Sequence, residues 1–316
     1  MEIRQAVEMM KNEIGKVIYG KEDIVELLMN ALINRGHVLL ESVPGTGKTM
    51  LARSLAKTID GDFKRVQFTP DVLPSDVSGI QFFHPQKQEF QLRPGPVMTN
   101  ILLADEINRA TPRTQASLLE VMEERQVTID GETLPLPNPF IVVATQNPIE
   151  AQQGTFPLPE AQMDRFFMQL DLGYPNLEQE KEMMQKYRKE EPFKQLLSIF
   201  SKEDILSLQE QVKEVTLSEV IEDYLLAIVD KTRKSDEIQL GVSPRGTLAL
   251  MKAAQAKALM EGRSFVIPED IKFVAPYVLT HRIVLSIEGE MKFTKHGVIK
   301  ELLETVEVPV EIGDRA

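Results

Sequence analysis

Residues 41–49, ESVPGTGKT, constrain the fold of this chain more than any other segment. They follow a short apolar run at 37–40 and precede a segment, 48–59, whose apolar residues have helical spacing. A glycine-rich loop between a strand and a helix is the context that a phosphate-binding loop requires. Its glycines let backbone N–H groups turn toward phosphate oxygens, and the helix amino terminus adds partial positive charge. The alternative, an ordinary glycine-rich turn, does not explain the GTGKT core.

This loop predicts a site for ATP and Mg²⁺. Lys48, which we expect to face solvent in the empty loop, would reach the β- and γ-phosphates, and the Thr49 hydroxyl would bind Mg²⁺. Ser42 stands where the pattern G-x-x-x-x-G-K-[ST] has glycine, and it would add strain of roughly 1 kcal/mol if this position needs a positive φ. The other residues that we expect to line the nucleotide are Pro44, Gly45, Thr46, Gly47 and Met50.

Short apolar runs alternate with helical segments through the first half of the chain. The strand candidates are residues 37–40, 64–68, 101–104, 140–145 and 166–170. Continuous apolar runs separated by helices indicate a parallel sheet that is covered on both faces. Residues 80–92 and 127–136 break this alternation and read as hairpins, the second with Asp130-Gly131 suited to a type I′ turn.

The second half of the chain changes character and reads as all-helical. Asn176 and Ser201 each begin a helix with the sequence signature of a capping box. Pro244 and Pro268 suit the first turn of two further helices. We therefore expect an α/β nucleotide-binding domain at 1–174 and a helical lid domain at 175–316.

Two polar segments follow predicted strands and can carry chemistry. Asp105 and Glu106 end a buried strand and resemble a Walker B segment, in which Asp105 would hold Mg²⁺ through water and Glu106 would act as general base. Alone this pattern is weak, but the phosphate loop upstream makes it specific. Asn147 ends the fourth strand, where a polar side chain can sit between the γ-phosphate and water. We prefer it to Gln146, and a simple strand-to-loop turn is the alternative.

Arg165, just before the fifth strand, and Arg245, at the start of a helix in the second domain, are the candidate phosphate-binding arginines. A guanidinium group offers paired donors and stays protonated. Without a family pattern, a surface salt bridge is the simpler interpretation of each.

Charge and composition exclude several classes of protein. Lys and Arg number 36 against 48 Asp and Glu, so the net charge of −12 argues against tight nonspecific binding to nucleic acid. The chain has no cysteine, which excludes disulfides and thiolate metal sites, and its four histidines lack ligand spacing. It shows no signal-peptide pattern and no apolar stretch long enough to span a bilayer, so we expect a cytoplasmic protein with no membrane insertion.

The order of six segments resembles the MoxR-type AAA+ ATPases over about residues 13–285: ESVPGTGKT, QFTPDVLPSDVSG, ILLADEINRATPRTQASLLEVMEE, VVATQNPIE, LPEAQMDRF and VSPRGTLALMKAA. The resemblance implies an α/β P-loop core with a parallel five-stranded sheet of order 5-1-4-3-2, followed by the helical lid. It makes residues 76–96 the helix-2 insert and residues 126–137 the hairpin before the sensor-1 strand.

The resemblance also implies roles for single residues. Asn147 falls on the sensor-1 position and Arg245 on the sensor-2 arginine, and Arg165 falls on the arginine finger that is supplied to a neighbouring subunit. The adenine is expected beside Val17, Ile18 and Tyr19.

Members of this family form hexameric rings and act as chaperone-like remodellers of a protein client, typically with a partner that bears a von Willebrand factor A domain. Two other functions stay open, an ATP-driven nucleic-acid motor and a nucleotide-dependent scaffold. The acidic hairpin tip, with Asp130 and Glu132, favours a protein client over DNA. A scaffold that does not hydrolyse ATP would predict the loss of Glu106 or Arg165, and both are present.

Overall fold

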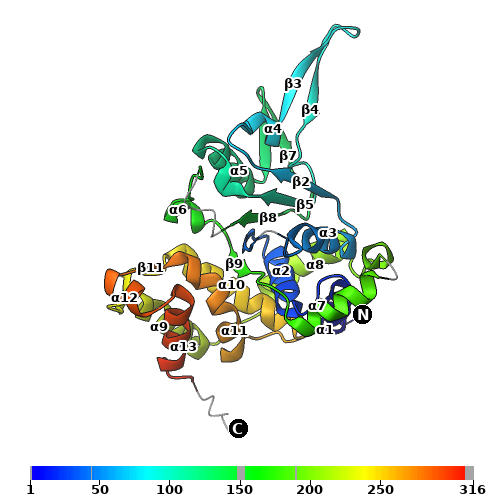
Figure 1. Ribbon diagram of the computed structural model, residues 1–316. Helices are drawn as coiled ribbons and strands as arrows, with labels where there is room; N and C mark the ends of the chain where they lie inside the picture. Colours follow the sequence, from blue (N-terminus) through cyan, green and yellow to red (C-terminus); the bar gives the residue numbers. More distant parts are fainter. Residues whose placement is uncertain (1, 44, 148–153, 189–190, 310–316) are drawn as a thin grey trace.

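The computed structural model describes residues 2–43, 45–147, 154–188 and 191–309. An α/β body carries a projecting β-ribbon at one end, and the C-terminal helices pack against the other end of the body (Figure 1).

Five parallel strands form the central sheet in the order β2-β5-β8-β1-β9. Their bounds are β1 Val38–Glu41, β2 Phe63–Gln67, β5 Ile101–Asp105, β8 Ile141–Gln146 and β9 Met168–Asp171. Numbered within this sheet alone, the order is 5-1-4-3-2 read from the opposite edge, so the predicted topology is confirmed. The carboxyl ends of parallel strands meet at one edge of the sheet, which therefore collects the loops that follow β1, β5 and β8.

Helices cover both faces of the sheet. Alternate residues of β5 enter two separate apolar clusters, with Leu103 in one and Leu102 in the other. This division matches the period of two residues in a strand. The helices and 3₁₀ turns of the body are α1 Ile3–Gly15, α2 Glu22–Ile33, α3 Lys48–Thr58, α4 Pro74–Ser78, η1 Ile107–Arg109, α5 Pro112–Glu124 and α6 Glu160–Met163.

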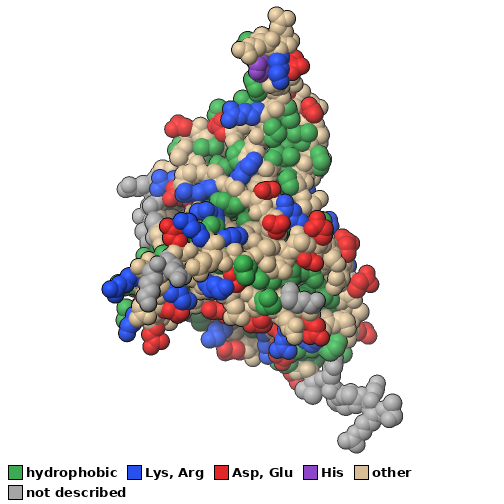
Figure 2. All heavy atoms as spheres, turned by 90° about the vertical axis from the view of Figure 1, so that its right-hand side faces the viewer, with side chains coloured by type: hydrophobic (Ala, Val, Ile, Leu, Met, Phe, Trp, Pro, Cys, Tyr) green, Lys and Arg blue, Asp and Glu red, His purple; other side chains and the backbone are tan. Residues whose placement is uncertain are grey.

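Two antiparallel ribbons leave the α/β body. In the first, β3 (Gly79–His84) pairs with β4 (Glu89–Pro94), and this ribbon extends beyond the rest of the molecule (Figure 1). Figure 2 shows it at the top of the molecule, with hydrophobic side chains exposed along it. In the second, β6 (Gln126–Ile129) pairs with β7 (Glu132–Pro135). Asp130 and Gly131 at its tip have φ of 48° and 90°, as the predicted type I′ turn requires.

The C-terminal part is mainly helical. Its helices and 3₁₀ turns are α7 Leu177–Tyr187, η2 Pro192–Gln195, α8 Lys202–Gln211, η3 Val212–Glu214, α9 Glu219–Lys234, α10 Pro244–Met260, α11 Pro268–Leu279, η4 Thr280–Arg282, α12 Ile287–Lys292 and α13 Lys295–Thr305. The predicted capping boxes at Asn176 and Ser201 are both present. The expectation of an all-helical part is wrong in one detail, because β10 (Ile238–Leu240) and β11 (Val284–Leu285) pair as a small antiparallel sheet. Strands of three and two residues are too short to show a period-two pattern.

The C-terminal helices share their core with the N-terminal helices. One apolar cluster runs from α1, α2 and β1 into α8, α10 and α11. Polar contacts cross the same boundary: the Asn30 amide donates to the carbonyl of Ala253 (2.8 Å), and the Gln209 amide donates to that of Leu32 (2.9 Å). The division that the sequence suggests near residue 174 falls between β9 and α7.

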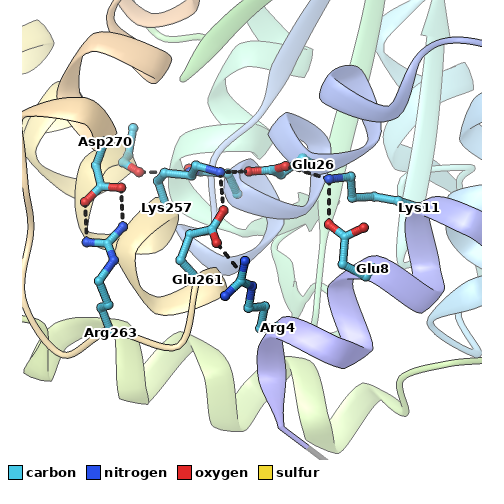
Figure 3. A network of polar contacts seen from close by, with 10 residues as sticks. Arg4, Glu8, Lys11, Glu26, Lys257, Glu261, Arg263 and Asp270 are labelled. Carbon is cyan, nitrogen blue, oxygen red and sulfur yellow. Dashed lines mark hydrogen bonds and ion pairs between the residues drawn. The ribbon is translucent and has the colours of Figure 1, made fainter.

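Charged side chains also join α1 and α2 to α10 (Figure 3). Glu26 on α2 is 5% exposed and binds two lysines, Lys257 on α10 and Lys11 on α1, the latter at 3.1 Å. Lys257 also pairs with Glu261 at 2.7 Å and lies over the ring of Phe273, 4.5 Å from its centre. These contacts hold the two N-terminal helices on the C-terminal part.

None of the helices in the described ranges combines the length and the hydrophobicity that a membrane-spanning segment requires.

Candidate nucleotide site

The phosphate loop takes the conformation that its glycines allow. Gly45 and Gly47 have φ of 85° and 91°, and the space beside Gly45 is open, so the backbone angle rather than crowding requires glycine there. Gly47 is the N-cap of α3 and provides no side-chain cap. The N–H groups of the first turn are therefore left for another acceptor, as in an anion site. The Thr46 hydroxyl donates to the carbonyl of Val43 at 3.0 Å, and Pro44 lies outside the described residues.

The expected strain at Ser42 is absent. Ser42 is not among the described residues with positive φ, and its N–H extends the pairing of β1 by donating to the carbonyl of Gln146 (3.4 Å). The left-handed positions of the loop are Gly45 and Gly47 alone within the described part of it. The Ser42 side chain is buried, and its hydroxyl has no hydrogen-bond partner among the described residues.

Lys48 is buried, at 9% exposure, rather than solvent-facing as the sequence suggested. No ion pair joins it to any residue in the described ranges, and Thr49 and Met50 beside it are partly buried. An unpaired charge in such a place is unfavourable unless an anion approaches it. The Lys48 ammonium, which has no ion-pair partner among the described residues, and the uncapped amino terminus of α3 together fit the phosphates of a nucleotide.

Asp105 and Glu106 are fixed by the neighbouring strands. The buried Asp105 carboxylate accepts from the Thr145 hydroxyl (2.6 Å) with one oxygen and from the Arg65 guanidinium (2.6 and 3.1 Å) with the other. Glu106 has a left-handed backbone, with φ of 59°, and its N–H donates to the same Thr145 hydroxyl at 2.9 Å. Neither Thr145 nor Arg65 was predicted from the sequence to belong to the site. Thr145 could have been inferred from its place near the end of β8, two residues before Asn147.

Two side chains hold the Glu106 carboxylate. Its Oε2 accepts from the Gln67 amide at 2.9 Å and pairs with Arg109 at 3.0 Å. Gln67 ends β2, next to β5 in the sheet. Asn147, buried at 3% exposure, directly follows β8 on the other side of β5 and so belongs to the same edge. The carboxyl edge thus brings the phosphate loop, Asp105, Glu106 and Asn147 to one side of the molecule.

The segment expected beside the adenine lies against the phosphate loop. Val17, Ile18 and Tyr19 connect α1 to α2 and are all buried. The Ile18 Cδ1 lies 3.5 Å from where a Cβ would stand on Gly47. The Tyr19 hydroxyl donates to the Lys16 carbonyl at 2.9 Å, which fixes the connection. An apolar segment in this place suits the face of a base.

Arg165 and Arg245 lie together, and away from the phosphate loop. Each binds one oxygen of the same carboxylate, that of Glu123, at 2.5 Å. Arg165 precedes β9, which runs parallel to β1, so it lies at the amino edge of the sheet while the loop after β1 lies at the carboxyl edge. With a rise of about 3.3 Å per residue, strands of this length separate the two edges by roughly 13–20 Å.

A cavity of about 430 Å³ opens beside this arginine pair. Its charged lining consists of six cationic side chains and two carboxylates: Arg35, Arg125, Arg165, Arg245, Lys252, Arg282, Glu123 and Asp164. Burial, followed by the charge of Arg35, lowers the pKa of Arg125 to about 10, which leaves it protonated at neutral pH. This edge is therefore strongly positive on a chain whose net charge is −12.

Two family models and several known proteins match this chain. Residues 37–168 match the ATPase family associated with various cellular activities (AAA), and residues 230–301 match the AAA lid domain. The uncharacterized protein YeaC of Bacillus subtilis is 50% identical over 299 residues, which cover 94% of this chain and 93% of that protein. Chaperone MoxR1 of Mycobacterium tuberculosis is 42% identical over 307 residues, which cover 94% of this chain and 81% of that protein.

A solved structure has the same fold over nearly its full length. The crystal structure of a protein provisionally assigned as an ATPase, from Cytophaga hutchinsonii, aligns with a TM-score of 0.89 at 41% identity. The alignment covers 98% of this chain and 96% of that one.

Proposed function

Because the chain belongs to the MoxR-type AAA+ ATPases, we propose that it binds Mg²⁺-ATP and hydrolyses the terminal phosphate bond at a site shared by two subunits. The observation that carries this proposal is the separation of two groups of residues across the sheet. The phosphate loop and Glu106 belong to the carboxyl edge, and Arg165 and Arg245 belong to the amino edge. Two copies can complete one site if the amino edge of one faces the carboxyl edge of the next.

Within one subunit, the phosphate loop and the start of α3 provide the donors for the phosphates. Lys48 and the N–H groups at the start of α3 bind them. The Thr49 hydroxyl would bind Mg²⁺ and Asp105 would hold it through water, and this cation would supply positive charge beside the transferred phosphoryl group. The apolar segment that ends in Tyr19 takes the adenine.

The carboxylate of Glu106 acts as the general base toward the attacking water. In this structure it is held by Gln67 and Arg109, so it exchanges those partners for water before hydrolysis. Thr145 keeps the backbone of Glu106 and the side chain of Asp105 in fixed positions. Asn147 orients the water from the neighbouring strand.

The neighbouring subunit supplies the two arginines. Their positive charges stabilise the charge that develops on the phosphate in the transition state. A contact between the amino edge of one copy and the carboxyl edge of the next is head-to-tail, and it closes into a ring when the rotation between copies allows. The family supports a ring of six.

We assign this ring a chaperone-like action on a protein client, working with a partner that carries a von Willebrand factor A domain. A relative is named as a chaperone, which supports this role. The acidic tip of the β6–β7 ribbon, at Asp130 and Glu132, and the net charge of −12 disfavour a nucleic-acid motor.

Mixing two inactive variants tests the shared site. Arg165→Ala should keep ATP binding and lose roughly 10³-fold or more in turnover, the range of known arginine fingers. Lys48→Ala should lose ATP binding. In mixed rings, some interfaces combine the intact loop of the first variant with the intact arginines of the second, so part of the ATPase activity should return.

Two results would contradict this proposal. One is mixed rings that exchange subunits, as checked by native mass spectrometry, and remain inactive. The other is a monomer that hydrolyses ATP at the full rate of the assembled protein.

A further inference from the structure

Glu123 is the one carboxylate that both Arg165 and Arg245 contact in the described structure. It lies near the end of α5, and its Oε2 and Oε1 bind Arg165 Nη1 and Arg245 Nη2, both at 2.5 Å. The side chains of all three are partly exposed, between 37% and 46%. An ordinary surface ion pair at such exposure contributes little to stability. Two arginines on one carboxylate, next to a cavity that gathers further cations, need another explanation.

The geometry of the contact leaves both arginines able to bind a second anion. Each arginine donates to Glu123 from one terminal nitrogen. Because a guanidinium group carries five N–H donors, the others remain for a second anion. Without a carboxylate between them, the two like charges would repel each other and separate. Arg35, Arg125 and Lys252 around the same cavity would add to that repulsion.

The backbones that carry the two arginines are joined as well. Asp164, next to Arg165 in the chain, accepts from Arg282 (2.8 Å) with one oxygen and from the Ser243 hydroxyl (2.9 Å) with the other. Ser243 in turn caps α10, the helix whose first turn carries Arg245. The Arg282 side chain is 2% exposed and that of Asp164 is 22% exposed, so this connection is partly buried. Asp164 fixes the two backbones, and Glu123 fixes the two side chains.

We propose that Glu123 is a positioning residue that holds Arg165 and Arg245 side by side as one phosphate-binding unit. This inference rests on the proposed function, in which that unit reaches the nucleotide of the neighbouring subunit. Glu123 acts through the arginines and makes no contact with the nucleotide itself. Its removal should therefore lower kcat and leave the binding of ATP to the phosphate loop unchanged.

Charge-removing and charge-keeping variants separate this role from a structural one. Glu123→Gln should lower kcat about 10- to 100-fold, the loss that misplacement of a catalytic group causes. KM and the affinity for a fluorescent ATP analogue should stay within about twofold of wild type, a range set by ordinary surface changes. Glu123→Asp should recover part of kcat. Glu124→Gln, the same change on the adjacent exposed residue, is the matched control and should keep wild-type turnover.

A double-mutant cycle tests whether Glu123 acts through the arginines. In the Arg245→Ala background Glu123 has one arginine left to hold, so Glu123→Gln should lower kcat by a smaller factor than in wild type. An equal factor in both backgrounds, or wild-type kcat in Glu123→Gln alongside lost turnover in Arg165→Ala, would overturn the positioning role and leave the shared site standing. Full turnover in Arg165→Ala would instead overturn the shared site and this inference with it.

Discussion

His37 shows how one buried side chain makes the body sensitive to pH. It directly precedes β1, and its Nδ1 accepts from the N–H of Val142 at 2.9 Å while its Nε2 donates to the carbonyl of Met122 at 3.0 Å. These two bonds select the neutral ring with its proton on Nε2. Burial, followed by the charge of Arg125, lowers the pKa of His37 to about 3.

We expect the free energy of unfolding to decrease as the pH is lowered from 6.5, and His37 to cause part of that decrease. The folded-state pKa is below the unfolded value, so only the unfolded chain takes up a proton between pH 6.5 and pH 3, and the stabilising contribution is lost as the pH falls through that window. At pH 5 the loss relative to pH 7 is about 2 kcal/mol. Urea unfolding of wild type and His37→Gln at both pH values measures it. The variant should lose about 2 kcal/mol less than wild type, and equal losses would refute the assignment.

The charged network of Figure 3 sets how α2 and α10 are joined. Glu26 is buried between Lys11 and Lys257. Neutralising it removes the one buried carboxylate from two nearly buried ammonium groups and leaves each with a more exposed partner, Glu8 for Lys11 and Glu261 for Lys257. Breaking a buried ion pair from one side is strongly destabilising, because the remaining charge stays desolvated.

Glu26→Gln should therefore lower the free energy of unfolding by about 3 kcal/mol. Glu8→Gln is the matched control. Glu8 also binds Lys11, at 2.8 Å, but its side chain is 57% exposed, and its replacement should change stability by no more than about 0.5 kcal/mol. Chemical denaturation at one pH and salt concentration compares the two. Similar losses for both variants would show that burial of the network contributes little.

The elements that sequence predicts well are those with a local pattern. Three strands of the sheet, β1, β5 and β8, are mainly continuous apolar runs. The capping boxes at Asn176 and Ser201 are short polar signatures, and the turn at Asp130-Gly131 follows from residue type. Each is decided within a few residues, so tertiary contacts do not override it. The small β10–β11 sheet was missed because its short strands pair across about forty residues.

The candidate site divides in the same way. The phosphate loop and Asp105 follow from spacing and residue type, but their partners do not. Thr145 reaches Asp105 from another strand, and Glu123 reaches Arg245 from an element more than a hundred residues away. A single side-chain contact between residues so far apart in the sequence produces no repeating pattern from which it could be predicted. The backbone angle of Ser42 also depends on the pairing of β1 with β8, which a motif does not encode.

On the scale of the whole molecule, the α/β body and the C-terminal helices do not have separate cores. The apolar cluster beneath α1 and α2 continues into the C-terminal helices, and Asn30 and Glu26 bind that part directly. A chain cut at residue 174 would expose the apolar faces that α8, α10 and α11 cover.

We accordingly expect the fragment 1–174 to bind the dye ANS and to aggregate, and the intact chain to unfold in a single thermal transition. A shared core makes the two parts cooperative, since neither can open without exposing the other. Calorimetry of the intact chain and dye fluorescence of the fragment are the measurements. Two well-separated transitions, with a monomeric fragment that does not bind the dye, would contradict the expectation.

The length of the β3–β4 ribbon can change without altering the α/β body, because of how the chain enters and leaves it. Gly79 and Pro94, where the chain enters and leaves, are register partners across the two strands. Because the two ends are already adjacent, residues can be added to or removed from the ribbon without moving the sheet, and the chain-entropy cost of a longer loop grows slowly. Its exposed Phe83 and Phe90 can therefore change during evolution while the nucleotide site stays the same. The same AAA+ body can therefore be combined with ribbons of different length and sequence.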